Sequence, residues 1–251
     1  MFKDLVDDLD SFSLEPHLFL DVPFVPSEDA VVKALLQMAG VGRKDVVYDL
    51  GCGDGRIVIA AAKHYRARAI GIELDPLRIA EAMEAAADEG VEMQVDFIEE
   101  SLFDADFSAA TVLTLYLLDS INTQLRPRFL EELRPGSRIV SHAFDMGDWQ
   151  PDDQRKVNGI TLYKWVVPGK VAGSWAWEGP DGTPFHAELE QKYQQVTGIA
   201  WQGDSPREIK NAHLNGNQLT LTLHEPGSGM ARHFALHFEN QQLLLVEEYA
   251  A

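Results

Sequence analysis

From Val46 onward, the hydrophobic positions alternate between short continuous runs and runs with helical spacing. Continuous runs are typical of buried strands, and helical spacing is typical of amphipathic helices. The expected strands cover residues 46–50, 69–73, 94–98, 111–117, 137–142 and 160–167. The expected helices cover residues 55–64, 76–89 and 122–133, and an earlier helix ends at Gly40 with Ser27 as its cap. This alternation predicts an α/β fold, a Rossmann-like doubly wound, mostly parallel sheet.

The pattern changes near Pro168, where helical spacing disappears. Short alternating runs follow at 174–177, 185–193, 196–201, 209–214, 218–224, 233–238 and 243–248. Asn215-Gly216 separates two of these runs, and Asn-Gly between alternating runs is a strong hairpin signal. We therefore expect a small C-terminal antiparallel β domain, built as a sheet or a partial barrel.

The chain divides into three expected parts. Residues 1–22 are acidic with scattered apolar positions and are expected to form an N-terminal arm. Residues 23–167 carry the α/β pattern and residues 168–251 the β pattern. The prolines at the start of the middle part predict extended backbone over residues 23–26.

The charge of the chain bears on its partners. The 251 residues carry a formal net charge of -19. This argues against nucleic acid as a partner, because neutralising phosphates needs a basic face. It is compatible with a basic partner, such as an amine or a lysine-bearing protein surface, although solubility alone is the simpler explanation.

The distribution of cysteine and apolar residues bears on the compartment. There is one cysteine, so the chain has no internal disulfide framework, and no Cys/His cluster indicates a metal. No apolar run approaches the roughly 20 residues that span a bilayer, so no membrane partner is expected. The first residues are acidic and lack the features of a signal peptide. We expect a cytoplasmic protein.

Residues 46–56 combine a strand, an acid and a glycine-rich turn that leads into a helix. The turn contains Gly51, Cys52, Gly53 and Gly55. Glycine lets the backbone approach a ligand closely, and the start of the helix offers free N–H groups. Asp49 and Asp54 would repel a pyrophosphate. They suit a ligand with both an ammonium and a carboxylate group, such as S-adenosyl-L-methionine (SAM).

A second acid strengthens this interpretation. Glu73 ends the next expected strand, roughly 20 residues past the glycines, where ribose-binding acids of wound α/β folds lie. A carboxylate can accept hydrogen bonds from both vicinal hydroxyls of a ribose. The strand, the turn and the two acids together predict a nucleotide site of the SAM type.

Residues 22–167 resemble the seven-strand SAM-dependent methyltransferases, and within them the archaeal protein lysine methyltransferases and their mitochondrial relatives. The motifs that carry the resemblance are residues 22–27, 48–56, 71–76, 115–118 and 135–142. The β-rich C-terminal part resembles extensions found on some bacterial relatives. The resemblance implies a transferase that N-methylates lysine side chains of protein, with S-adenosyl-L-homocysteine (SAH) as the other product.

The resemblance also implies roles for individual residues. The loop Gly51–Gly55, which includes Cys52, would hold the methionine part of SAM, with Asp49 near its amine. Glu73 would bind the ribose, and Leu74 would lie near the adenine. Phe24, Val25 and Pro26 would cover the mouth of the site.

The chain departs from the family pattern at two of these positions. The family often has Tyr where this chain has Phe24, so a hydroxyl is missing. Near the adenine it usually has an acid or Asn where this chain has Ser101, and Glu100 could substitute.

Three residues are candidates for the catalytic side of the site. Tyr116 ends the fourth expected strand, where its hydroxyl could orient an amine or its ring could simply pack. Asn122 is a polar candidate, although a helix-start cap is the favoured interpretation. His142, followed by Asp145, could relay a proton, although a structural histidine is favoured. Cys52 is expected to fill the loop rather than act as a nucleophile.

Other interpretations stay open at this point. The acceptor could be a small molecule instead of a protein. The chain could also be a non-catalytic SAM-binding scaffold whose β region contacts a partner. The β region itself could form a homodimer or act as a lid. An open acidic groove would favour a protein acceptor, and a closed apolar pocket a small one.

Overall fold

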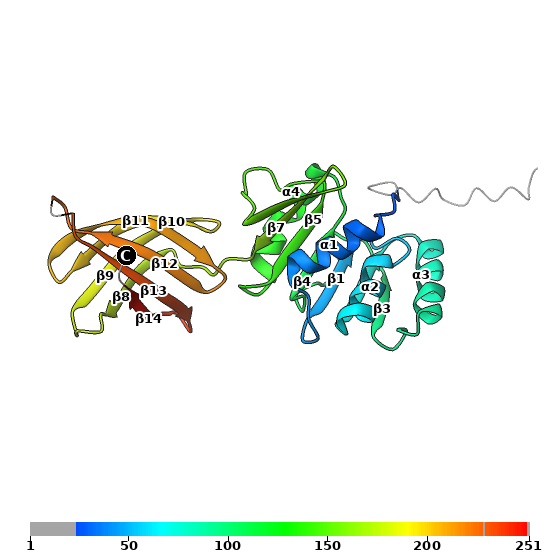
Figure 1. Cartoon of the computed structure of the whole chain (residues 1–251), viewed down its shortest axis with the longest axis horizontal. Coiled ribbons are helices and arrows are strands. Elements are labelled where there is room, and N and C mark those ends of the chain that lie inside the picture. Colours follow the sequence, from blue (N-terminus) through cyan, green and yellow to red (C-terminus); the bar gives the residue numbers. More distant parts are fainter. Residues whose placement is uncertain (1–23, 228, 250–251) are drawn as a thin grey trace, which may run out of the picture.

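The computed structural model describes residues 24–227 and 229–249, so the expected acidic arm, residues 1–22, lies outside the described residues. The described residues form two seven-stranded sheets that lie end to end along the molecule (Figure 1). The first sheet has the strand order β3-β2-β1-β4-β5-β7-β6. Its strands are β1 (Val46–Leu50), β2 (Arg68–Glu73), β3 (Val95–Glu99), β4 (Val112–Leu115), β5 (Arg138–His142), β6 (Asp153–Val157) and β7 (Ile160–Val166).

The first sheet is parallel from β1 to β5, and β7 runs antiparallel to both β5 and β6. The helices are α1 (Asp29–Ala39), α2 (Arg56–Tyr65), α3 (Pro76–Asp88) and α4 (Asp119–Glu132). Val47 belongs to a hydrophobic cluster with α1 and α2, and its neighbour Tyr48 belongs to a second cluster with α4. Because successive strand residues point to opposite faces, helices cover both faces of the sheet. The predicted doubly wound fold is confirmed.

Two helix starts differ from the prediction. Helix α4 begins at Asp119, three residues before the expected start, with Leu118 in the cap position. Ser27 does not cap α1, because Glu28 occupies the cap position and makes no side-chain cap bond. The Ser27 hydroxyl is instead hydrogen-bonded to Nδ1 of His142, at 2.8 Å.

Strand β6 was not expected. Its sequence is DQRKV, which offers almost no apolar residue to a pattern search. It lies at the edge of the sheet, where charged side chains are common because one edge of the strand remains unpaired. The turn to β7 uses Asn158 and Gly159, both with positive φ.

The second sheet is an antiparallel meander with the strand order β14-β13-β12-β11-β10-β9-β8. Its strands are β8 (Gly173–Glu178), β9 (Pro184–Lys192), β10 (Gln195–Gln202), β11 (Ser205–Asn215), β12 (Gln218–His224), β13 (Ala231–Glu239) and β14 (Gln242–Tyr249). One face packs around a core that includes Trp177, Phe185 and Phe234. The outermost strands β8 and β14 also contact each other, which gives a partial barrel. The predicted C-terminal β domain is confirmed.

No helix in the described ranges combines the length and the apolar character needed to cross a membrane.

Candidate functional site

A pocket lies at the carboxyl ends of β1, β2 and β4, where ligands bind in wound α/β sheets. The predicted residues that line it are Phe24, Pro26, Asp49, Gly51, Cys52, Glu73, Leu74, Glu100, Ser101 and Tyr116. Gly53 and Gly55 belong to the same loop but do not line it, and neither do Asn122 and His142. The fold therefore gathers most of the predicted residues around one cavity.

The glycine loop has a shape that only glycine supports at two positions. Gly53 and Gly55 both have positive φ, at 53° and 74°. A Cβ on Gly53 would overlap the ring of Phe24, and one on Gly55 would lie 2.8 Å from the ring of Phe97. The loop is fixed to β2, because the N–H groups of Gly51 and Cys52 both donate to the carbonyl of Ile72, at 2.9 Å.

Glu73 is held by the backbone around it. Its Oε2 accepts the N–H of Gly53 at 2.8 Å, and its Oε1 accepts the N–H groups of Leu74 and Asp75 at 2.9 and 3.0 Å. A carboxylate has about four lone-pair positions, so about one acceptor position remains for a ligand. The side chain thus joins the glycine loop to the start of α3, and its direction is set before any ligand binds.

Asp49 is a buried acid on the floor of the pocket. Burial, together with the nearby charges of Glu73 and Asp54, raises the pKa of Asp49 to about 7, although the hydrogen bond from Thr114 opposes this shift. The Thr114 hydroxyl donates to Oδ1 at 2.6 Å. A buried carboxyl of this kind suits a cationic ligand group, which would favour its charged form.

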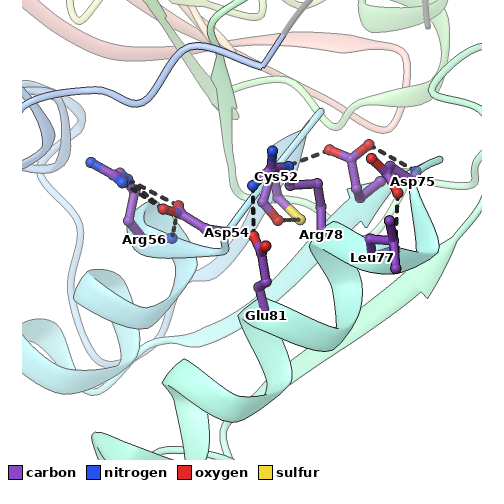
Figure 2. A network of polar contacts seen from close by, with 9 residues as sticks. Cys52, Asp54, Arg56, Asp75, Leu77, Arg78 and Glu81 are labelled. Carbon is purple, nitrogen blue, oxygen red and sulfur yellow. Dashed lines mark hydrogen bonds and ion pairs between the residues drawn. The ribbon is translucent and has the colours of Figure 1, made fainter.

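The entrance segment, residues 24–28, is tied to the glycine loop by Arg56. The Arg56 guanidinium pairs with both oxygens of Asp54 (Figure 2). Its Nη1 also donates to the carbonyl of Ser27 at 2.7 Å. Burial raises the pKa of Asp54, but the hydrogen bond and charge of Arg56 outweigh it and hold that pKa below its usual value. The ring of Phe24 lies 4.3 Å from the guanidinium of Arg78.

Cys52 fills space beneath the loop, as predicted. Its thiol is buried, and a Cβ on Gly71 would lie 2.5 Å from its sulfur. Burial and then the charge of Asp49 raise the pKa of the Cys52 thiol far above its usual value. A thiol in this environment stays protonated and is a poor nucleophile.

The side of the pocket at β4 is aromatic. The Tyr116 ring stacks on the ring of His142 at 3.7 Å between centroids, and the Phe144 ring lies 6.2 Å from Tyr116. His142 is buried, which lowers its pKa, although the charge of Glu28 opposes this shift. Its place behind Tyr116 and its bond to Ser27 fit the favoured interpretation of a structural histidine.

Asn122 is not a helix cap, so that interpretation was wrong. It lies inside α4, fully buried, and its Nδ2 donates to the carbonyls of Phe144 and Asp145 at 3.4 and 3.1 Å. Because α4 begins at Asp119, Asn122 points toward the backbone that follows β5. Its Nδ2 supports this turn, and its Oδ1 is buried without a hydrogen-bond partner among the described residues.

Several pocket residues were missed by sequence reasoning. Ser27, Arg56 and Arg78 line the pocket and hold its entrance. Arg56 carried a weak signal, because it follows the glycine turn and lies two residues after Asp54. Ser27 carried a misleading one, since its position before a helical run is typical of a cap.

Comparisons with known proteins identify the fold family. Residues 49–153 match the family described as "ANTKMT methyltransferase domain". A protein-lysine N-methyltransferase of Saccharolobus islandicus (strain REY15A) is 41% identical over 160 residues, which are 62% of this chain and 97% of that protein. The chain belongs to the SAM-dependent methyltransferases. The resemblance noted in the sequence is therefore confirmed.

Two further proteins are similar to this methyltransferase. A solved RNA methyltransferase from Salinibacter ruber, in complex with SAH, shares 49% identity with a TM-score of 0.58, covering 59% of this chain and 96% of that one. The adenine nucleotide translocase lysine N-methyltransferase of Mus musculus is 32% identical over 53% of this chain, and the match spans only 58% of that relative.

Proposed function

We propose that this methyltransferase transfers a methyl group from SAM to the side-chain nitrogen of lysine residues in protein. The observation that carries the proposal is the 41% identity to a protein-lysine N-methyltransferase over 97% of that relative's length. The ANTKMT-type domain match points the same way. The acidic character of the chain, at a net charge of -19, suits a lysine-bearing partner.

The residues of the pocket fit SAM. Gly51 brings loop backbone without a side chain to the pocket wall, and Asp49 offers a buried acid for the amine. Glu73 retains an acceptor position for a ribose hydroxyl. SAM, when bound, supplies a methyl group already activated by a positively charged sulfur. The protein therefore mainly needs to position the two reactants, and positioning can contribute about 7–11 kcal/mol to lowering the barrier.

The remaining predicted contacts lie around the glycine loop, Asp49 and Glu73. Leu74, Glu100 and Ser101 line the part of the pocket beyond Glu73, where the adenine would lie. The Ser101 hydroxyl accepts the N–H of Phe103 at 3.3 Å, so its own proton is free to point elsewhere. Phe24 and Pro26 lie at the mouth and would cover the ligand.

A lysine acceptor must arrive without its proton. With a pKa near 10.4, fewer than about one lysine in a thousand is neutral at pH 7. Contact with the aromatic side of the pocket removes water and lowers that pKa. In our proposal the Tyr116 hydroxyl orients the neutral amine. His142 acts as a positioning residue, because it holds the Tyr116 ring by stacking and the entrance segment through Ser27.

A second candidate acceptor is RNA, because the Salinibacter ruber structure with 49% identity is described as an RNA methyltransferase. The net charge of -19 opposes this candidate, since RNA binding needs cationic groups to neutralise phosphates.

The test is incubation of the full chain with tritiated SAM and a cell extract, divided into protein, RNA and small-molecule fractions. We expect label in discrete proteins that resists ribonuclease, and mass spectrometry should find it on lysine nitrogen. A chain with Asp49→Ala and Glu73→Ala is the control for contaminating activity. Label confined to RNA or to small molecules would refute the proposal. SAH binding without any transfer would leave the scaffold interpretation.

A further inference from the structure

The turn between β9 and β10 lies against residues 148–150 of the methyltransferase domain. The indole N–H of Trp149 donates to Oε1 of Gln194 at 2.9 Å, and Nε2 of Gln194 donates to the carbonyl of Gln150 at 2.6 Å. Trp149 and Gln194 are 1% and 8% exposed. The oxygen and the nitrogen of the buried Gln194 side chain thus both bond to the methyltransferase domain. Loss of either bond leaves a buried polar group without a partner.

Tyr193 adds a second connection at the same place. Its φ is 55°, a conformation that is strained for a bulky residue. In this conformation its ring stacks on Trp149 with centroids 5.6 Å apart, and its hydroxyl donates to Oδ1 of Asp148 at 3.0 Å. Lys192 also forms an ion pair with Asp148 at 2.9 Å. Strain of this kind persists only where the surrounding contacts hold it.

The segment held in this way lies behind the Tyr116 side of the pocket, because its Phe144 ring is next to the ring of Tyr116, which lines the pocket. We call residues 144–150 the acceptor segment. At its start, Ala143 has a φ of 67° and the N–H of Phe144 donates to the carbonyl of His142 at 2.9 Å, which forms a strained γ-turn. This turn places the Phe144 ring beside Tyr116.

Helix α4 fixes the middle of the acceptor segment. The N–H of Asp145 donates to Oδ1 of Asp119 at 2.9 Å, and Nη1 of Arg126 donates to the carbonyl of Met146 at 2.7 Å. Arg126 also pairs with Asp148 at 2.6 Å. The acceptor segment is therefore held at its start by the γ-turn, along its middle by α4 and at its end by the β domain.

We propose that the C-terminal β domain positions the methyl acceptor, by holding the acceptor segment in place beside Tyr116 through Gln194 and Tyr193. The inference rests on the proposed function. The Saccharolobus islandicus relative aligns over 97% of its length with 62% of this chain, so it has no counterpart to the remainder. A protein-lysine N-methyltransferase thus exists without such a region, so we assign the β domain a role on the acceptor side rather than in methyl transfer itself.

The test uses the full chain with Gln194→Ala and Tyr193→Phe, and Gln202→Ala as the matched control. Gln202 lies at the opposite end of β10 and bonds to Arg207 within the same sheet. The acceptor is the extract protein that the unmodified chain labels on lysine. We expect the acceptor KM to rise about fivefold or more for Gln194→Ala and less for Tyr193→Phe, with a smaller change in kcat. SAH affinity, measured by calorimetry, should stay within about twofold, because the donor contacts are untouched.

The outcomes separate the two proposals. If the unmodified chain labels no lysine, the proposed function fails before any variant is made. If lysine is labelled but Gln194→Ala and Tyr193→Phe have the acceptor KM of the Gln202→Ala control, the positioning role is refuted. If Gln194→Ala also loses SAH binding, Gln194 is needed for folding. The acceptor KM of Tyr193→Phe, which removes only one oxygen, then decides whether the β domain positions the acceptor.

Discussion

Asp49 is an acid in an unusual environment, because its carboxyl is buried and has a pKa of about 7. The folded protein therefore holds the Asp49 proton more tightly than the unfolded chain, where the pKa is 3.8. Below pH 3.8 the Asp49 carboxyl is protonated in both states and has no effect on the free energy of unfolding. Above pH 7 it is ionised in both states, and the folded state bears the full cost of a buried charge.

We expect Asp49→Asn to stabilise the ligand-free protein and to weaken donor binding. The stability gain over the parent should grow between pH 4 and pH 7 and reach on the order of a few kcal/mol. The Asn oxygen can still accept the Thr114 hydroxyl. Urea unfolding at several pH values measures the first effect, and calorimetry with SAH the second. A variant that binds SAH like the parent would remove Asp49 from the amine site.

Tyr116 is the residue at which donor and acceptor would meet, and its hydroxyl can be removed without disturbing its ring. We expect Tyr116→Phe to lower kcat by about tenfold or more while SAH affinity and stacking on His142 persist, since orientation of the amine is lost but the cavity is unchanged. Single-turnover rates with a labelled lysine acceptor measure this. Equal rates for the two proteins would show that Tyr116 only packs.

At the scale of elements, the glycine loop and the entrance segment interlock, and this can be tested with a matched pair of glycines. Gly53 and Gly40 both have positive φ, at 53° and 64°, so an alanine is strained at either position. Only at Gly53 does the new Cβ overlap a ring, that of Phe24, because the space around Gly40 is open.

We therefore expect Gly53→Ala to displace the entrance segment and weaken SAH binding about tenfold or more, whereas Gly40→Ala loses only stability, by roughly 1 kcal/mol. Calorimetry and thermal unfolding of both variants measure these effects. Similar SAH affinities would mean that Phe24 does not cover the ligand.

Strand β4 was predictable because its residues are buried on both faces. Residues 112–115 of β4 are all buried, and such a run is visible without any structure. Strand β6 was not predicted from the sequence, because an edge strand needs little apolar surface and its residues are mostly polar. The start of α4 was misplaced because Asp119-Ser120 resembles a loop, although Asp119 suits the first turn of a helix.

The candidate site likewise contains residues that could be predicted from the sequence and residues that could not. Asp49 and Glu73 were predictable because each lies at or near the end of a buried strand, next to the turn. The contact between Ser27 and His142 joins residues 115 positions apart, and no local pattern encodes it. Asn122 was misread for the same reason, since its partners follow β5. Local spacing therefore predicted the residues of the pocket next to the glycine loop, whereas the contacts around Tyr116 and His142 depend on tertiary packing.

At the scale of the whole molecule, the net charge of -19 should act on how a basic acceptor approaches. Three exposed acids lie near this side of the site, since Asp119 accepts the N–H of Asp145 and the charge of Glu28 acts on His142. Attraction between exposed charges is screened within about 10 Å at 0.1 M salt.

We expect kcat/KM for a lysine-bearing protein acceptor to fall about tenfold between roughly 0.05 and 0.5 M salt, mainly through KM, because steering affects encounter rather than chemistry. Steady-state assays over a salt series measure this, with SAH affinity followed in parallel as a control for general effects of salt. Asp119→Asn with Asp145→Asn should flatten the salt dependence, and exchange of two acids in the β domain, Glu188→Gln with Glu190→Gln, should not. A rate that does not respond to salt would mean that the charge serves solubility alone, the simpler explanation that composition suggests.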